Sequence, residues 1–367
     1  MDPVRRAHAE TIDRLRKGLS DLAADAMLDA DPALAGRYGS DARRIWRTEL
    51  GIRLAHLAES IACGRPAMFA AHAAGAASAL RVRRVPDRDI DAHLAQLEAV
   101  LSAELPDDVA AAALPFLRAA RDTACAAHEP YGLLDSQDRD STLARLFLLH
   151  LLQREKDQAA TVALDALRGG MKLVDVHERV LAPALGEVGR MWQSQEASIA
   201  DEHYCTAAAR VIAGQLRGAA QASARRPDGR RALCAAMGGD MHDTGLRMAA
   251  DLLELDGWTA EYLGADVPAA EVVMAVEDGE QEGGRRIDLV VVSASTDLAI
   301  RPVADLVAAL RMSPTARRVP VLVGGGPFSA DPTLAREVGA DAGASSLRGA
   351  VAEAASLVPA RGPTAVR

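Results

Sequence analysis

Apolar and polar positions alternate in blocks along the C-terminal third of the chain. Short β-branched runs, such as residues 287–292, are separated by longer segments with the apolar spacing of helices. The near-continuous apolar runs are typical of parallel strands that are covered by helices on both faces. The pattern predicts a doubly wound, Rossmann-like and flavodoxin-like α/β domain over 231–357. Its predicted strands are 231–237, 259–264, 287–293, 319–324 and 340–345, and its predicted helices are 245–256, 268–281, 299–311, 330–337 and 347–357.

The rest of the chain has helical periodicity only. Residues 141–222 predict a small four-helix bundle, in which Gly169-Gly170 separates the second helix from the third. Residues 1–135 predict a separate all-helical domain, and 358–367 a flexible tail. The N-terminal helices are predicted at 3–29, 40–62, 67–80, 88–104 and 107–127.

Composition narrows the class of protein only slightly. The 367 residues are 49% hydrophobic without an apolar run of membrane-spanning length, which favours two or three soluble domains. A net charge of −9 argues against a nucleic-acid surface. The N-terminus lacks the core of a signal peptide, so a cytoplasmic location with reduced cysteines is expected.

The motif Asp240-Met241-His242-Asp243-Thr244-Gly245 follows the first predicted strand and precedes a predicted helix. A polar turn at the carboxyl end of a strand is where parallel sheets bind ligands. A neutral imidazole is a good ligand for a transition metal, and a nearby carboxylate that accepts its other N–H would fix the tautomer. The alternative is a surface histidine beside an aspartate that caps the helix.

This D-x-H-x-x-G pattern resembles the signature of cobalamin-binding domains. The resemblance implies that His242 is the lower axial ligand of cobalt, with Asp240 behind it. In that family, a serine and paired glycines after later strands line a slot for the nucleotide tail of the corrin. The Ser-Ala-Ser sequence here leaves open which hydroxyl contacts the tail, and ordinary tight turns would explain each glycine run alone. The corresponding positions are Gly245, Ser293, Ser295, Gly324, Gly325 and Gly326.

A second motif lies in the predicted bundle, where Trp192 is followed after nine residues by Glu202-His203. This spacing resembles the Trp-x9-Glu-His motif of light-sensing cobalamin proteins of the CarH type, which encloses the upper adenosyl group. A core tryptophan and a solvated Glu-His pair would explain the same residues. The CarH type has a histidine directly after the tryptophan, but this chain has Gln193. His150, His177, His203 or water are therefore the candidates for the upper cobalt position after photolysis.

The N-terminal 135 residues show no DNA-binding signature. An all-helical domain before a cap and a cobalamin domain resembles the photocobilins, which pair cobalamin with biliverdin. A set of aromatic, histidine and cysteine residues is a candidate lining for that flat ligand, although core aromatics and surface histidines explain each residue better when it is taken singly. A dimerisation role is the alternative for the domain as a whole. The set is Tyr38, Trp46, His56, Cys63, Phe69 and His72.

These resemblances imply a light sensor rather than an enzyme. Adenosylcobalamin would lie between bundle and sheet, and photolysis would move the cap and change a homo-oligomer that signals to an unknown output protein. The alternative is a corrinoid carrier for methyl transfer, which also joins a helical bundle to a D-x-H-x-x-G domain. A bulky tryptophan tuned to the adenosyl group would separate the two. A mutase subunit lacks the barrel partner it would require.

Overall fold

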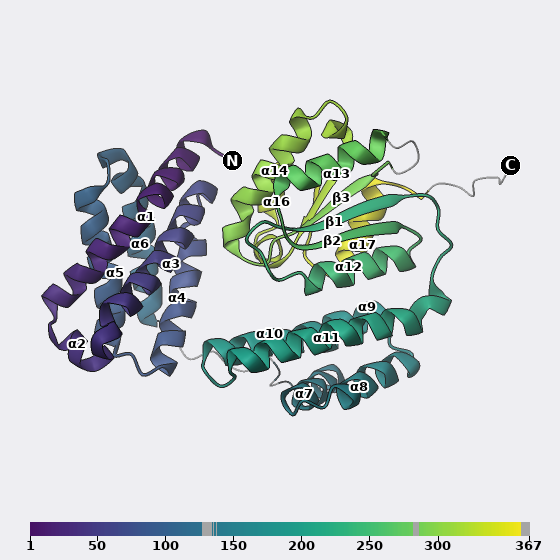
Figure 1. The fold of residues 1–367 in the computed structure, drawn as a ribbon, viewed down its shortest axis with the longest axis horizontal. Helices are drawn as coiled ribbons and strands as arrows, with labels where there is room; N and C mark the ends of the chain where they lie inside the picture. Colours follow the sequence, from purple (N-terminus) through teal and green to yellow (C-terminus); the bar gives the residue numbers. More distant parts are fainter. Residues whose placement is uncertain (127–133, 135, 137, 282–285, 361–367) are drawn as a thin grey trace. The chain divides into compact units, whose positions relative to one another are not determined.

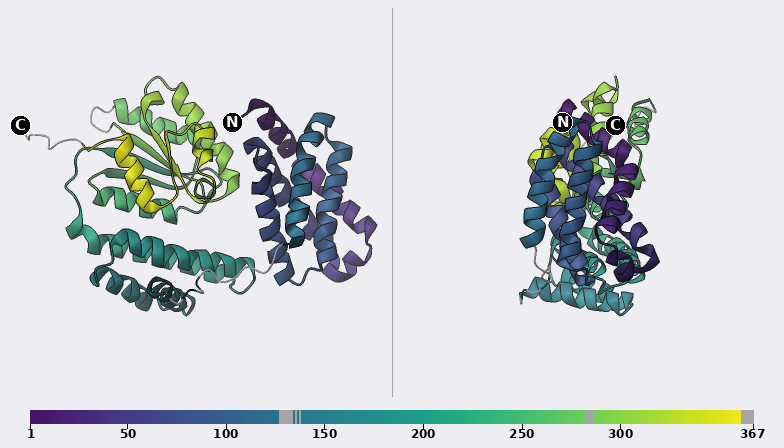
Figure 2. Two further views of the ribbon diagram at one scale, coloured as in Figure 1. Left: turned by 180° about the vertical axis from the view of Figure 1, so that it is seen from behind. Right: turned by 90° about the vertical axis from the view of Figure 1, so that its left-hand side faces the viewer.

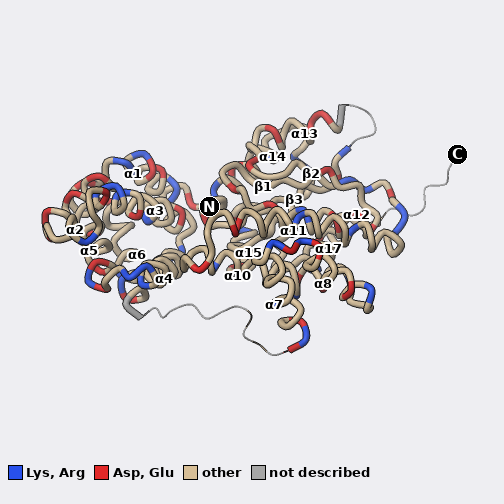
Figure 3. The backbone as a smooth tube through the Cα atoms, turned by 60° about the horizontal axis from the view of Figure 1, so that its bottom comes forward, with Lys and Arg blue, Asp and Glu red and all other residues tan. Residues whose placement is uncertain are grey.

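The computed structural model describes residues 1–126, 134, 136, 138–281 and 286–360. Contacts divide the chain into two compact units, Met1–Pro130 and Tyr131–Arg367. None of the helices in these ranges has both the length and the apolarity that a bilayer crossing needs. Basic and acidic positions are interspersed along the backbone of both units (Figure 3).

The first unit is entirely helical, as the apolar periodicity predicts. Asp2 caps its first helix by accepting hydrogen bonds from the backbone N–H groups of Val4 and Arg5, at 2.9 and 3.0 Å. Gly64 ends the third helix in the left-handed conformation, with φ of 64°. The short second helix was not predicted. The helices are α1 (Pro3–Ala30), α2 (Ala33–Tyr38), α3 (Ala42–Cys63), α4 (Pro66–Val82), α5 (Asp87–Glu104) and α6 (Asp107–Ala126).

The second unit begins with the predicted bundle, which we call the cap. Its third helix is continuous from Leu173 to Gln193, because a π-helical turn at His177–Leu181 joins α9 to α10 directly before Pro183. A capping box of Ser198 and Asp201 starts the last helix. The cap helices are α7 (Arg139–Leu152), α8 (Lys156–Arg168), α9 (Leu173–Val176), α10 (Ala182–Gln193) and α11 (Ile199–Ala220).

A five-stranded parallel sheet completes the second unit, and the predicted doubly wound fold is confirmed. The strands lie in the order β2-β1-β3-β4-β5. The chain adds β2 on one side of β1 and β3 on the other, which is the flavodoxin-like arrangement. The strands are β1 (Arg231–Met237), β2 (Thr259–Val267), β3 (Leu289–Ser293), β4 (Val321–Gly324) and β5 (Ala342–Ala344).

Helices cover both faces of this sheet (Figures 1 and 2). The helices α12 (Thr244–Leu255) and α17 (Leu347–Leu357) pack together on the face toward the cap, and α13 (Ala269–Gln281) packs with α14 (Ile300–Met312) on the other. Met248 and Leu252 of α12 are buried within the same apolar cluster as the cap helices. The short helices α15 (Gly326–Ala330) and α16 (Thr333–Glu337) follow β4. The helix α12 therefore contributes to two cores, that of the cap and, through Leu246, Ala250 and Leu253, that of the sheet.

Candidate functional site

His242 lies in the turn between β1 and α12, with a buried carboxylate behind it. Its Nδ1 is 3.2 Å from Oδ1 of Asp240, and the same oxygen accepts the backbone N–H of His242 at 2.9 Å. The His242 side chain is 71% exposed, whereas that of Asp240 is 1% exposed. The hydrogen bond to Asp240 raises the pKa of His242 above its usual value. With the Nδ1 proton directed at Asp240, Nε2 is the nitrogen available to an external partner.

The turn after β3 holds this pair in place. The backbone N–H of Ser295 donates to Oδ2 of Asp240 at 2.5 Å, and its hydroxyl donates to the carbonyl of His242 at 2.8 Å. Burial alone would raise the pKa of Asp240, but the hydrogen bonds from His242 and Ser295 outweigh it and hold that pKa below its usual value. Asp240 is therefore an ionised acceptor that fixes the orientation of the imidazole.

A cavity of about 330 Å³ opens beside His242 at the carboxyl edge of the sheet. It lies between the ends of β3, β4 and β5 and the helices α12 and α17, and most of its lining is apolar. Apart from Asp240, all the sheet-domain positions predicted from the sequence line it. They are His242, Gly245, Ser293, Ser295, Gly324, Gly325 and Gly326.

Gly325 is the glycine in this lining where an added side chain would clash most severely with the backbone. Its φ is +106°, and a Cβ atom built on it would lie 2.0 Å from the carbonyl oxygen of Ala294. The turns after β3 and β4 therefore approach each other more closely than any side chain would allow.

The cap residues predicted from the sequence are only partly brought together. Glu202, in the first turn of α11, accepts hydrogen bonds from Nδ1 of His203 at 2.5 Å and from the hydroxyl of Thr206 at 2.9 Å. Trp192 lies one helix away, near the end of α10, with 44% of its surface exposed. The charges of Glu202 and His242 act on each other, because each shifts the pKa of the other in the direction that favours ionisation. A direct contact between α11 and the His242 turn is the hydrogen bond from Arg210, two turns beyond Glu202, to Asp243.

Comparison with known proteins identifies both parts of this unit. A family model described as B12 binding domain matches residues 230–354, and a second model of that description matches 143–217. The second unit is a B12-binding domain with its helical cap. The monomethylamine corrinoid protein of Methanosarcina barkeri has the same fold, with a TM-score of 0.51 at 21% identity, covering 60% of this chain and all of that one.

A second corrinoid protein is similar to this chain in amino-acid sequence. Dimethylamine corrinoid protein 3 of Methanosarcina acetivorans is 28% identical over 120 residues, which is 33% of this chain and 53% of the relative. The chain thus spans about half the length of that protein. The matched models fall within the second unit, on the cap and the B12-binding domain.

The B12-binding domain also contains site residues that the sequence did not predict. Asp243 is buried and accepts hydrogen bonds from Arg210 of the cap and from the hydroxyl of Tyr262 on β2. The spacing Glu202, Thr206, Arg210 would have shown that these side chains share one face of α11. Tyr262 had no local signal, since its contact depends on the pairing of β2 with β1.

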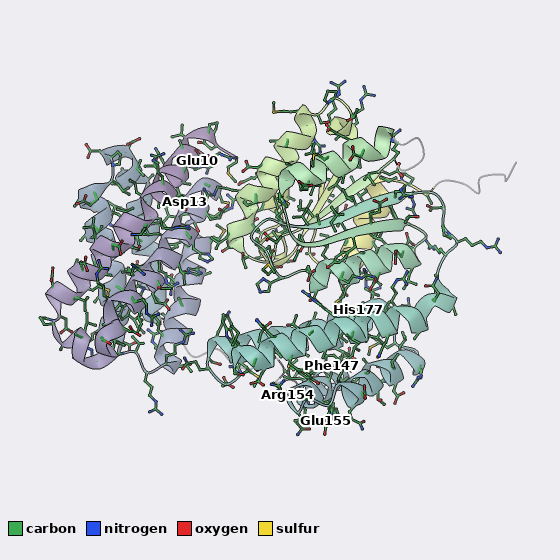
Figure 4. The ribbon with its side chains drawn as sticks, viewed as in Figure 1. Glu10, Asp13, Phe147, Arg154, Glu155 and His177 are labelled. Carbon is green, nitrogen blue, oxygen red and sulfur yellow. The ribbon has the colours of Figure 1, made fainter. Side chains whose placement is uncertain are left out.

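The proposed upper cobalt positions differ sharply in environment. His177 is fully buried inside the cap, where burial lowers its pKa to about 4, and Figure 4 shows it on the cap with Phe147. His150 pairs with Glu155 through Nδ1 at 2.7 Å. The side chain of His203 is 72% exposed and contacts Glu202. Of the three, His203 is the one that directly follows Glu202, whose charge acts on His242.

The aromatic and histidine residues of the first unit are mainly part of its core. Trp46 and Phe69 belong to the apolar core cluster, at 1% and 0% exposure, and Cys63 is equally buried. The rings of His56 and His72 stack with their centroids 3.5 Å apart. Tyr38 packs edge-on against Trp46 at 5.6 Å. These positions favour the core-packing explanation over the lining of a flat-ligand pocket.

Proposed function

We propose that this protein is a corrinoid carrier for methyl transfer, with the corrin held between the cap and the B12-binding domain. The observation that carries the proposal is the joint position of the exposed His242 imidazole and the 330 Å³ cavity at one sheet edge. An imidazole nitrogen beside a cavity suits a corrinoid, because the nitrogen can bind the cobalt while the cavity takes the nucleotide tail. The bound corrinoid would supply a cobalt centre that accepts and releases a methyl group.

The residues of the chain then have distinct tasks. His242 would bind the lower face through Nε2, while Asp240 accepts the Nδ1 proton and increases the basicity of the imidazole. Ser295 holds both residues through its N–H and hydroxyl. The glycines after β4 line the cavity and would let the backbone come close to the tail. The two relatives, a dimethylamine and a monomethylamine corrinoid protein, support methyl transfer over other uses of this fold.

A second candidate function is light sensing with adenosylcobalamin, which the spacing of Trp192 and Glu202-His203 favours. Glu202 lies on the cap helix α11 and acts electrostatically on His242, which supports a position on the cap side of the proposed corrin. An exposed indole on the same cap is a surface against which an adenosyl group would pack. Biliverdin in residues 1–135 belongs to this second candidate, as do a light-dependent homo-oligomer and an output protein.

One set of measurements separates the two functions. The full chain is titrated with methylcobalamin and adenosylcobalamin in the dark, and each complex is then illuminated and passed over a sizing column. A carrier binds the methyl form at least as tightly as the adenosyl form, and its elution is unaffected by light. A sensor prefers the adenosyl form, loses that preference in Trp192→Ala, and changes its elution volume after light. If neither corrinoid binds, both proposals are wrong.

A further inference from the structure

Asp243, the residue after His242, is held from two sides. Its carboxylate is buried, with only 9% of its side chain exposed. It accepts a hydrogen bond from the hydroxyl of Tyr262 on β2 and another from the guanidinium of Arg210 on α11. One donor thus comes from the sheet and the other from the cap.

Arg210 reaches further than this single pair. Its Nε donates to the hydroxyl of Thr244 at 3.2 Å, so one guanidinium holds both residues that follow His242. Asp243 is the N-terminal cap position of α12, and Thr244 is the first residue of that helix. The start of α12 and the His242 turn are therefore tied directly to α11.

Arg210 is not the only arginine that joins these helices. Arg217, two turns further along α11, donates to Glu254 at 2.8 Å and lies 3.5 Å from Asp251. Both of its partners lie in the second half of α12, two to three turns beyond His242. Arg217 therefore joins the cap to the domain without touching the turn that carries the proposed cobalt ligand.

We propose that Arg210 is a positioning residue that couples the cap to the His242 turn, so that cap closure and His242 ligation of the corrinoid favour each other. This inference rests on the proposed lower-ligand role of His242. Without Arg210, Tyr262 is the one side-chain partner among the described residues that the buried carboxylate of Asp243 retains. A buried charge that loses a partner drives its surroundings to rearrange. The turn that moves is the one that carries His242. Because coupling between sites is reciprocal, ligation through His242 would in turn favour the closed cap.

The test uses the full-length chain loaded with cob(II)alamin. The protein carries nitrogen-15-labelled histidine, so that the nitrogen splitting in the electron paramagnetic resonance spectrum measures the fraction of cobalt bound by histidine and not by the nucleotide base of the corrinoid. We expect Arg210→Ala to lower the ratio of His-ligated to unligated corrinoid about tenfold and Arg210→Lys to restore part of it. Arg217→Ala is the matched control: it removes an arginine from the same helix interface and should leave the ratio at the wild-type value. Tyr262→Phe should give an intermediate loss, and it provides the test if Arg210→Ala does not fold.

The possible results separate this inference from the function on which it rests. An equal His-ligated ratio in wild type, Arg210→Ala and Tyr262→Phe overturns the coupling while leaving the role of His242 intact. An equal decrease in Arg210→Ala and Arg217→Ala also overturns it, because the effect would then belong to the interface in general. A wild-type complex without the splitting from labelled histidine overturns the lower-ligand role, and this inference with it.

Discussion

Three largely buried histidines of the first unit and His242 of the second unit lie in opposite environments. In the first unit, burial lowers the pKa of His56, His72 and His93 to about 4, 2 and 3. In the second unit, His242 is mainly exposed and its pKa is raised by the carboxylate of Asp240. An imidazole that burial keeps neutral serves as a packing group. An exposed imidazole in front of a buried carboxylate has the arrangement expected of a metal ligand.

Buried polar contacts reinforce this difference. In the first unit, the buried guanidinium of Arg53 donates to Glu49 at 2.9 Å. The same guanidinium lies 3.0 Å from Nε2 of His72, so this ring nitrogen already has a partner. In the second unit, the buried polar partner of His242 occupies Nδ1 and leaves Nε2 exposed to a ligand. The position of the polar partner of a histidine therefore distinguishes the histidines of the core from His242 better than the residue type does.

The largest effect that we predict tests whether the first unit uses its aromatics for packing. Trp46→Ala should lower the free energy of unfolding of that unit by about 3–5 kcal/mol, because a fully buried indole leaves a cavity. Urea unfolding followed by circular dichroism measures it, and cobalamin affinity should not change. Trp192→Ala is the matched control: its indole is 44% exposed, so its cost should stay below about 1 kcal/mol. Equal costs would contradict the assignment of Trp46 to the core.

The next effect tests the site. His242→Ala should weaken cobalamin binding by about 100-fold or more, because even the groups behind a metal ligand contribute 10- to 100-fold. Binding is measured by absorbance titration, in which the His-ligated form is also recognised. His56→Ala, which removes an imidazole from the other environment, should leave the affinity unchanged. A variant at His242 that keeps the wild-type spectrum would show that the cobalt is bound through another group.

The difference between the units also explains what the sequence could predict. The turn from Asp240 to Gly245 follows a strand, and a parallel sheet gathers the ends of its strands at one edge, so the residues after β3 and β4 could be placed beside His242. Positions in helices lack this constraint. Trp46 and Phe69 looked like a possible ligand pocket, because a helical sequence shows which face is apolar but not which helix covers it. Arg210 and Tyr262 were missed since their contacts depend on tertiary packing.

The pH dependence of stability should differ between the units. Above pH 6.5 the buried histidines are neutral in both the folded and the unfolded state, so stability does not depend on them. As pH falls below 6.5, only the unfolded state binds protons, so stability is lost. The loss is up to about 1.4 kcal/mol per pH unit for each histidine that stays neutral, until its folded pKa is reached.

Three such histidines are described in the first unit, whereas among the described residues of the second unit only His177 has a clearly lowered pKa. We therefore expect the unfolding temperature of the first unit to fall more steeply than that of the second as pH decreases from 6.5 to 5. Calorimetry of the full chain across this range measures the two transitions. His72→Gln should reduce the slope of the first transition, and a slope that is unchanged would contradict this explanation.

The smallest predicted effect compares two neighbouring glycines of the site. Gly325→Ala places a Cβ 2.0 Å from the carbonyl oxygen of Ala294 at a φ of +106°, so the turn must shift and stability should fall by about 1–3 kcal/mol. Gly324→Ala is the matched control, because its nearest neighbour would be the carbonyl oxygen of Ala344 at 3.5 Å, an ordinary contact. Both positions line the same cavity, so a ligand effect alone would affect them equally. Unfolding in urea without cobalamin isolates the backbone effect, and equal stability of the two variants would mean that the turn after β4 adapts without strain.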